Sequence, residues 1–287
     1  MQNKISDAIE QITGEHVVSL SALSGGCVGD VYKVTFAKRE PLVAKVAKVG
    51  QTGSGLALEG LMLQYLARHS ALPVPTVLHA DDTLLLMTFI ATGRGLNAAA
   101  QSQAADLLAA LHGITAESYG FPYDTLIGGL HQPNRQTGSW LAFFAEQRML
   151  DMARQGMDYG RLPGPLMKRI EALAGHLERW LNEPAQPSLI HGDVWGGNVL
   201  AADGRITGFI DPAIYFADAE IELAFSTLFA TFGDAFFSRY NEHRPIAPGF
   251  FEERRDLYNL YPLLVHVRLF GGSYVGSVEG ILRKFGF

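Results

Sequence analysis

The sequence has little cysteine and no long hydrophobic run. Its 287 residues include a single cysteine, Cys27, which excludes an intrachain disulfide and a cysteine-based metal cluster. No apolar stretch approaches the roughly 18 residues that a membrane-spanning helix needs. The first ten residues alternate polar and apolar side chains, unlike the basic and then apolar profile of a signal peptide. We therefore expect a cytoplasmic protein that has no membrane partner.

Charged residues are also scarce. They make up 18% of the chain, against about 25% in an average globular protein, so proportionally more of this chain can form an interior. The 23 basic residues are outnumbered by 29 acidic residues, and the formal net charge is −6. This balance argues against bulk electrostatic binding to nucleic acid or to an anionic membrane.

Glycine, in contrast, is abundant. The chain has 31 glycines among its 287 residues, whereas the usual share is about 7%. They follow no fixed period and form no low-complexity tract, which excludes collagen and a flexible linker. They fall in short clusters, where glycine permits a positive φ or a close approach of the backbone to a ligand. These clusters lie at Gly25–Gly26, Gly50–Gly55, Gly128–Gly129, Gly196–Gly197 and Gly271–Gly272.

The first 90 residues predict a small, mostly β unit with one helix. Residues 32–36 alternate apolar and polar side chains, which predicts a strand, and the runs 42–49 and 84–90 also have strand character. Between these runs, the apolar residues of 58–66 recur at i, i+3, i+4 and i+7, which is the spacing of an amphipathic helix.

Helical patterns dominate the rest of the chain. Apolar stripes predict helices within 104–111, 140–152, 166–177 and 250–270, and one β segment interrupts them at 189–211. The segment 92–95, with two glycines, is typical of a hinge. The sequence thus predicts an α+β fold of two lobes, formed by residues 1–90 and 91–287.

The segment 189–211 carries the strongest chemical pattern. It contains His191, Gly192 and Asp193 in a row, followed by Asn198, and it ends at Asp211. Asp193 lies on the loop that leads into the predicted strands, five residues before Asn198.

A hairpin is expected to bring the last two of these residues together. Asp203-Gly204 between two apolar runs predicts a two-residue turn. In that hairpin, Asn198 and Asp211 lie nearly opposite each other at the open end. Paired strands are about 5 Å apart, so an amide oxygen and a carboxylate converge there.

These residue types suit phosphoryl transfer. The oxygens of Asn198 and Asp211 are ligands for a hard cation such as Mg²⁺, and Asp193 could accept the proton of an attacking hydroxyl. The alternative is a polar turn whose side chains bond their own backbone. A lone Asp-Gly hairpin would favour that alternative, whereas the full spacing of the three polar residues favours a catalytic site.

The same segments resemble a known family. His-Gly-Asp-Val-Trp-Gly-Gly-Asn at 191–198, Ile-Asp-Pro-Ala-Ile-Tyr at 210–215 and the tail 257–271 resemble the fructosamine kinases, or ketosamine-3-kinases. This family lies within the protein-kinase-like and aminoglycoside phosphotransferase-like superfamily. The resemblance covers essentially the whole chain. It implies a protein-kinase-like fold with a small, mostly β nucleotide-binding lobe and a larger, mainly helical lobe for catalysis and substrate binding.

The resemblance also implies the chemistry. Asp193 would be the catalytic base, Asn198 and Asp211 would hold Mg²⁺, and a sugar hydroxyl would receive the γ-phosphate of ATP. The implied acceptor is O-3 of a ketosamine, a fructosamine or ribulosamine adduct of an amine or of a protein lysine. Phosphorylation would destabilise the adduct and allow the amine to be recovered.

The chain departs from the family at one point. The family's metal segment usually continues Tyr-Gly-His-Arg-Glu before Asp-Leu-Ala, whereas here Asp218-Ala219 replaces the His-Arg pair. The predicted base and metal ligands are unaffected. Any substrate contact that the pair makes in the family is missing from this chain.

A kinase also needs groups that hold the nucleotide. Lys45 lies among apolar residues of a strand, and Glu59 on the following helix is its natural partner; the pair would orient Lys45 on the α- and β-phosphates. The alternative is a snorkelling lysine and a solvated glutamate. Met87, Thr88 and Phe89 fall where adenine should meet the backbone between the lobes.

Gly25, Gly26 and Cys27 lie between two predicted strands, where backbone N–H groups could face phosphate oxygens. A glycine turn in a hairpin is the alternative. Cys27 also suggests a redox-linked dimer, because nearby N–H dipoles would favour a thiolate and its partner would have to come from another chain. A small residue that fills a turn explains Cys27 equally well.

Three residues are candidates for the acceptor side of the site. Trp195 could stack on the sugar or pack the loop, Tyr215 belongs to the metal segment, and His266 is expected on a helix face near the acceptor cleft. His191 is expected to brace the catalytic loop, and Glu222 to form an ion pair with an arginine.

Two other functions remain open. One is a kinase of the same fold that acts on an aminoglycoside, on choline or on another small alcohol. The other is a nucleotide-binding pseudokinase, although it would lack the base, the lysine or the metal ligands, and all of these are present. A protein kinase is less favoured, because no Ala-Pro-Glu follows Asp211 to end an activation segment.

Overall fold

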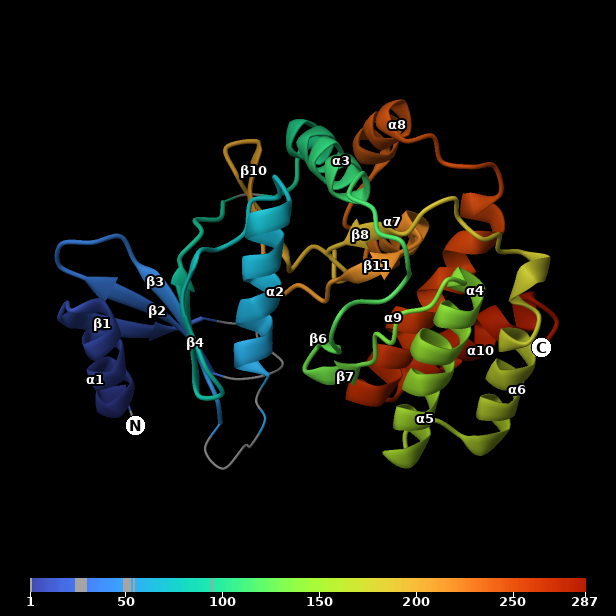
Figure 1. The fold of residues 1–287 in the computed structure, drawn as a ribbon, viewed down its shortest axis with the longest axis horizontal. Helices are drawn as coiled ribbons and strands as arrows, with labels where there is room; N and C mark the ends of the chain where they lie inside the picture. The colour runs from blue at the N-terminus through green and yellow to red at the C-terminus, as the bar shows by residue number, and fades with distance from the viewer. Residues whose placement is uncertain (1, 24–29, 49–52, 54, 94) are drawn as a thin grey trace.

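The computed structural model describes residues 2–23, 30–48, 53, 55–93 and 95–287 and has two lobes (Figure 1). The N-terminal lobe is built on a five-stranded antiparallel sheet in the order β1-β2-β3-β5-β4. Its strands are β1 (Val17–Ala22), β2 (Asp30–Phe36), β3 (Leu42–Val46), β4 (Val77–Ala80) and β5 (Leu84–Thr88).

Two helices cover the two faces of this sheet. Helix α1 (Gln2–Thr13) packs its apolar side against one face, and helix α2 (Leu56–His69) packs against the other. Because successive residues of a strand point to opposite faces, Ala44 of β3 faces α1 while Lys45 faces α2. The alternation of β3 therefore sends an ammonium group toward α2.

Helix α2 lies between the two lobes (Figure 1). Its Leu63 joins the apolar cluster of the sheet, whereas Met62 and Leu66 are buried in the large core of the C-terminal lobe. At the start of the helix, a Cβ on Gly55 would lie 2.2 Å from Cδ1 of Leu126 in the C-terminal lobe. Helix α2 is therefore packed against both lobes at once.

The C-terminal lobe is mainly helical, and α9 packs at its centre against α5, α7 and α10, while α3 pairs with α8. The helices are α3 (Ala98–His112), α4 (Trp140–Phe143), α5 (Asp151–Asp158), α6 (Gly164–Ala174), α7 (Ala219–Leu228), α8 (Asp234–His243), α9 (Arg255–Phe270) and α10 (Ser273–Lys284). A π-helical turn, Phe144–Leu150, joins α4 to α5, a second, Phe250–Arg254, leads into α9, and the 3-10 turn Leu177–Arg179 follows α6. No helix in the described ranges has the length and apolar character that a membrane crossing requires.

Three short two-stranded sheets in the described part of the C-terminal lobe flank the loops that line the cavity between the lobes. They pair β6 (Thr125–Ile127) with β7 (Leu130–Gln132), β8 (Ser188–Ile190) with β11 (Tyr215–Ala217), and β9 (Val199–Ala202) with β10 (Arg205–Phe209). The segment between the lobes is bonded to the β9–β10 hairpin, because the Gly93 amide donates to the Ala201 carbonyl at 2.8 Å.

The predicted α+β fold of two lobes is confirmed, and so are the helices within 58–66 and 104–111. The strands predicted at 42–49 and 84–90 end earlier, at Val46 and Thr88. Periodicity does not reveal α7, because most of its residues are buried and it lacks a polar face. The boundary at residue 90 stays a prediction.

Leu66→Ala should weaken the packing of α2 on the C-terminal lobe. Leu66 is 0% exposed, and truncating a buried leucine to alanine costs about 2–5 kcal/mol. We expect a loss of this size in the unfolding free energy measured in urea. Leu61→Ala on the same helix is the matched control, since Leu61 is 51% exposed, and it should cost less than about 1 kcal/mol. Equal losses for the two variants would contradict the anchoring of α2 in the large core.

Candidate active site

The loop at 191–193 is held by a buried carboxylate. Glu222 of α7 accepts hydrogen bonds from the Gly192 amide at 2.6 Å and the His191 amide at 3.3 Å. Its Oε2 also lies 2.8 Å from Nε2 of His112, whose Nδ1 lies 2.7 Å from the Tyr240 hydroxyl. Burial opposes the charge of Glu222, but the bonds from His112 and Gly192 outweigh it and lower the pKa of Glu222.

The prediction that Glu222 pairs with an arginine is therefore wrong. The side chain lies in the interior, where His112 of α3 and two backbone amides satisfy its oxygens. Sequence reasoning missed this role of His112, because the two residues are 110 positions apart and no local motif connects them.

Gly192 has the backbone conformation that the loop needs and that other residues rarely adopt. Its φ is +86°, and a Cβ at this position would lie 2.1 Å from the Ala213 carbonyl oxygen. The loop cannot move away easily, because the Ala213 amide donates to the His191 carbonyl at 2.8 Å. Only glycine fits here without strain.

Asp193 and Asn198 form a hydrogen-bonded pair. Nδ2 of Asn198 donates to Oδ2 of Asp193 at 2.8 Å and to its backbone carbonyl at 2.9 Å. Burial raises the pKa of Asp193 to about 8, with the charge of Asp211 adding to the effect. The carboxylate is thus both fixed in place and disposed to take up a proton.

The hairpin prediction is confirmed. Ala202 pairs with Arg205, and an irregularity between Ile206 and Gly208 shifts the later register by one residue. As a result the Ile210 amide donates to the Asn198 carbonyl at 3.0 Å.

That register leaves the side chains of Asn198 and Asp211 one position apart across the end of the hairpin. Asp211 itself has a φ of +55°, an uncommon conformation for a residue with a side chain. Strained backbone of this kind often occurs at functional sites.

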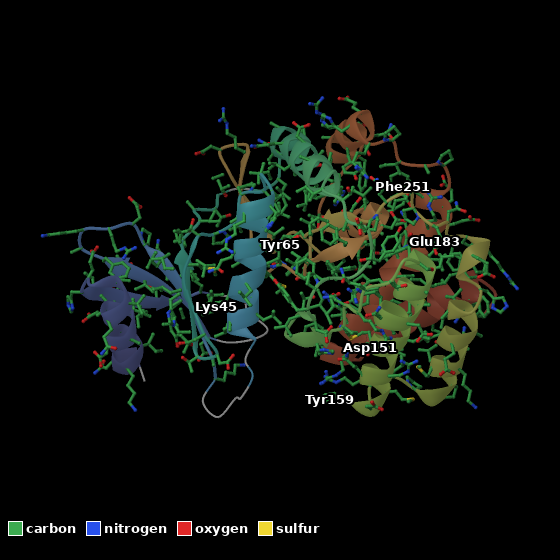
Figure 2. The ribbon with its side chains drawn as sticks, viewed as in Figure 1. Lys45, Tyr65, Asp151, Tyr159, Glu183 and Phe251 are labelled. Atoms are coloured by element: carbon green, nitrogen blue, oxygen red, sulfur yellow. The ribbon has the colours of Figure 1, made fainter. Side chains whose placement is uncertain are left out.

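Lys45 connects the two lobes. Its Nζ lies 2.6 Å from Oε1 of Glu59 and 2.6 Å from Oδ1 of Asp211. Burial opposes the charged ammonium, but the two carboxylates outweigh it and raise the pKa of Lys45, so that the group stays protonated. Figure 2 labels Lys45 beside α2, on the sheet side of that helix.

These groups line one cavity of about 580 Å³. The predicted site residues on its wall are Lys45, Glu59, Asp193, Trp195, Asn198, Asp211, Tyr215 and His266. The loop at 191–193, the hairpin, β3, α2 and α9 thus contribute to one space between the lobes.

Other predicted residues are not on this wall. Met87 is buried among the apolar residues of the sheet, and the amides of Thr88 and Phe89 donate to the carbonyls of Thr76 and Pro41. An adenine contact from Thr88 or Phe89 would therefore use a carbonyl oxygen or a side chain.

Gly25, Gly26 and Cys27 lie outside the described residues. The prediction of a phosphate-covering loop there remains a prediction. The redox-linked dimer through Cys27 is not supported.

Part of the cavity wall is aromatic. Phe225, Phe229, Phe270 and Tyr274 line it together with Trp195 and His266. The sequence pattern does not assign the first four to the site. Their spacing along α7, α9 and α10 is the ordinary spacing of helix packing, so only the fold gathers them at the site.

Asp218, which stands where the family has histidine, does not line the cavity. Its side chain accepts hydrogen bonds from the Glu220 amide at 2.9 Å and the Tyr258 hydroxyl at 2.6 Å. It therefore caps the start of α7, the helix that carries Glu222. In this chain the residue at this position stabilises the helix whose Glu222 holds the loop at 191–193.

The donor set fits Mg²⁺ that arrives with ATP. Asn198 uses its Nδ2 for Asp193, so its Oδ1 is the atom left for a cation, and Asp211 adds a carboxylate. Within the described ranges, no group of three or more His, Cys, Asp or Glu could hold a metal. ATP-bound Mg²⁺ needs no such group, because it takes one or two protein oxygens and completes its shell with phosphates and water.

The fold is that of the protein-kinase-like phosphotransferases. The structure of a gentamicin complex of the aminoglycoside phosphotransferase APH(2'')-IIa shares the fold, with a TM-score of 0.66 over 99% of this chain and 96% of that chain at 15% identity. Within this class, the chain belongs to the fructosamine kinase family, whose sequence profile matches residues 1–285.

Relatives with printed assignments cover nearly the whole chain. A Synechocystis protein assigned as a ketoamine kinase is 32% identical over 98% of this chain and 95% of its own length. A chloroplastic protein-ribulosamine 3-kinase of Oryza sativa subsp. japonica is 30% identical over 94% of this chain and 79% of its own. A crystal structure from Thermobifida fusca, assigned as a fructosamine-3-kinase, has a TM-score of 0.86 at 33% identity and covers 98% of this chain and 99% of that chain.

Gly192→Ala should disrupt the catalytic loop. The added Cβ would meet the Ala213 carbonyl oxygen at 2.1 Å and would require a positive φ, so we expect turnover to fall at least tenfold and thermal stability to drop by several degrees. Gly196→Ala is the matched control in the same loop, since nothing lies within 4 Å of its added Cβ. Kinetics and thermal melts of both variants check this, and an active, stable Gly192→Ala variant would contradict it.

Proposed function

We propose that the protein is an ATP-dependent ketosamine 3-kinase, which transfers the γ-phosphate of ATP to a sugar hydroxyl. The observation that carries this proposal is the meeting of Asp193, Asn198, Asp211 and Lys45 on one cavity, in a chain of the fructosamine kinase family. Phosphoryl transfer needs a base near the attacking oxygen, positive charge on the phosphates and a metal clamp. The described residues offer one group for each task.

Lys45 would supply the fixed positive charge. Its ammonium is buried and held by Glu59 at 2.6 Å, so Glu59 orients it toward the space where the α- and β-phosphates would lie. Because the second contact of Lys45 is Asp211, the same lysine ties the phosphate site to the metal site. Asn198 and Asp211 would hold Mg²⁺, which when bound neutralises charge on the β- and γ-phosphates.

Asp193 would act as the base. Its Oδ2 accepts from Asn198, which leaves Oδ1 for the acceptor hydroxyl. Burial and the charge of Asp211 raise its pKa to about 8, so the carboxylate readily takes the proton that the hydroxyl loses as it attacks. Glu222 contributes indirectly, because it fixes the backbone of the residue before Asp193.

The acceptor would be O-3 of a fructosamine or ribulosamine adduct, free or attached to a protein lysine. The relatives' assignments as ketoamine and ribulosamine kinases support this substrate class. Phosphorylation at O-3 would destabilise the adduct and return the amine. We place this activity in the cytoplasm, in keeping with the sequence-based prediction.

The lining of the cavity favours this acceptor over an aminoglycoside. Aminoglycosides carry several positive charges, and such ligands are held by carboxylates. The cavity wall includes aromatic and aliphatic residues such as Phe229, Phe270 and Val265, and its carboxylates already have partners within the protein. A small sugar with one amine suits this surface better.

Asp193→Asn should reduce kcat by about a hundredfold to ten-thousandfold, because it removes the general base, while the Kd for ATP stays within about threefold. Asp203→Asn is the control: Asp203 lies in the hairpin turn with a φ of +51°, a conformation that asparagine tolerates. Steady-state kinetics and nucleotide titration measure both effects. Unchanged turnover in Asp193→Asn would rule out its assignment as base.

A substrate screen tests the acceptor class. ADP release should be at least tenfold more efficient, as kcat/KM, with ribulosamine or fructosamine than with the free ketoses, choline or an aminoglycoside. Phosphorus NMR of the product should locate the phosphate on O-3. Highest efficiency with an aminoglycoside or choline would replace the proposed function by the alternative kinase activity.

A further inference from the structure

His266 of α9 offers one unpaired nitrogen at the acceptor side of the cavity. Its Nδ1 lies 2.7 Å from the carbonyl oxygen of Pro262. A carbonyl can only accept, so Nδ1 carries the proton of the neutral ring, and Nε2 is left with a lone pair. No described residue forms a hydrogen bond with Nε2, and the ring lines the cavity. His266 therefore presents a hydrogen-bond acceptor without negative charge.

The ring stays neutral near pH 7. Burial lowers the pKa of His266, against a smaller opposing effect of the bond to Pro262. The cavity wall also has carboxylates, and each of them already has a partner. Lys45 contacts both Glu59 and Asp211. Asn198 bonds Asp193, and His112 pairs with Glu222.

Aromatic rings surround His266. We name Trp195, Phe229, Phe270 and Tyr274, together with His266, the aromatic cage. Ring centroids of Phe229, Phe270 and Tyr274 lie 5.1, 5.7 and 4.8 Å from that of His266. Trp195 continues the cage, with its centroid 6.1 Å from Phe229. The side chains of Trp195, Phe229 and Phe270 are 40%, 38% and 56% exposed, so a ligand can reach the ring surfaces.

This combination suits a small organic ammonium ion. Aromatic faces attract a cation, and Nε2 can accept one of its N–H groups. A carboxylate would be repelled by the ring faces, and a neutral sugar hydroxyl would gain the hydrogen bond alone. The chemistry of the cage therefore distinguishes a protonated amine from a hydroxyl at the same position.

We propose that Nε2 of His266 accepts a hydrogen bond from the protonated secondary amine of a ketosamine, and that the aromatic cage encloses this nitrogen. This inference rests on the proposed function and adds to it the group that selects a ketosamine over the corresponding ketose. The amine is attached to C1 of the sugar and the reacting hydroxyl to C3. The two groups are thus two carbons apart in one molecule, and both Asp193 and His266 line the same cavity.

The test uses a matched pair of ligands that differ in one atom. The first is the ribulosamine of methylamine, and the second is 1-O-methyl-ribulose, in which an ether oxygen replaces the amine. The Kd of each is measured by calorimetry in the presence of ADP, and kcat/KM is measured with ATP. Because a hydrogen bond to a charged group contributes a factor of about ten to a hundred, wild-type protein should bind the amine more tightly than the ether by that factor.

Variants assign the preference to the cage. His266→Phe keeps an aromatic ring without the acceptor, and it should weaken amine binding about tenfold or more while the Kd of the ether stays within about twofold. His266→Gln restores an acceptor oxygen and should recover part of the preference. Phe229→Leu keeps an apolar side chain without the ring face and should lower the amine preference about twofold to fivefold.

His176→Phe is the matched control. His176 makes the same type of bond, from Nδ1 to the carbonyl four residues earlier at 2.8 Å, and it also contacts an aromatic ring, Phe287. It does not line the cavity, so the preference should remain at the wild-type value. A merely structural role for His266 would weaken both ligands equally.

The outcomes distinguish the role of the aromatic cage from the proposed kinase activity. Equal affinity of wild-type protein for amine and ether, or an unchanged preference in His266→Phe, would overturn the role of the cage whether or not turnover occurs. A preference that His266→Phe abolishes would support the cage even if neither ligand were phosphorylated. In that last case the proposed function would fail on its own, because the calorimetric preference does not depend on chemistry.

Discussion

The hydrogen bond between Glu222 and the Gly192 amide is the contact on which the rest of the site depends. It is 2.6 Å long and made by a buried glutamate, and it holds a residue whose φ of +86° only glycine adopts without strain. The next residue is Asp193, so loss of this hydrogen bond would displace the proposed base. Because the carboxylate is also paired with His112, helices α3 and α7 both contribute to the position of one loop.

A second set of contacts joins this loop to the N-terminal lobe. Asn198 bonds Asp193, and Lys45 bridges Asp211 and Glu59. Three segments that are distant in sequence thus meet through short polar contacts that are buried or partly buried. Each charge has a partner, which is the condition for keeping such groups away from water.

The arrangement of the site residues could be predicted largely because it is local in the sequence. The spacing of Asp193, Asn198 and Asp211, with the Asp203-Gly204 turn between them, determines a hairpin register that the structure reproduces to within one residue. The link between Lys45 and Glu59 could also be predicted, because a strand followed by a helix brings them together.

The contacts that could not be predicted depend on packing between segments that are distant in the sequence. Nothing near Glu222 in the sequence indicates His112 as its partner, and an arginine is the more common expectation for an isolated glutamate. The aromatic cage is another example, since Phe229, Phe270 and Tyr274 come from the ends of three helices. Helical periodicity identifies such residues only as apolar, and the meeting of the helix ends turns them into a binding surface.

Helix α2 has a consequence for control of the enzyme. In protein kinases, the helix that carries the glutamate partner of the lysine is positioned by regulatory signals. Here Met62 and Leu66 of α2 are buried in the C-terminal core, and exposing two such side chains would cost about 3–6 kcal/mol. An outward swing of α2 is therefore opposed by the packing itself, which keeps Glu59 beside Lys45. The packing of α2 on the C-terminal core thus does for this ion pair what a regulatory signal does in protein kinases.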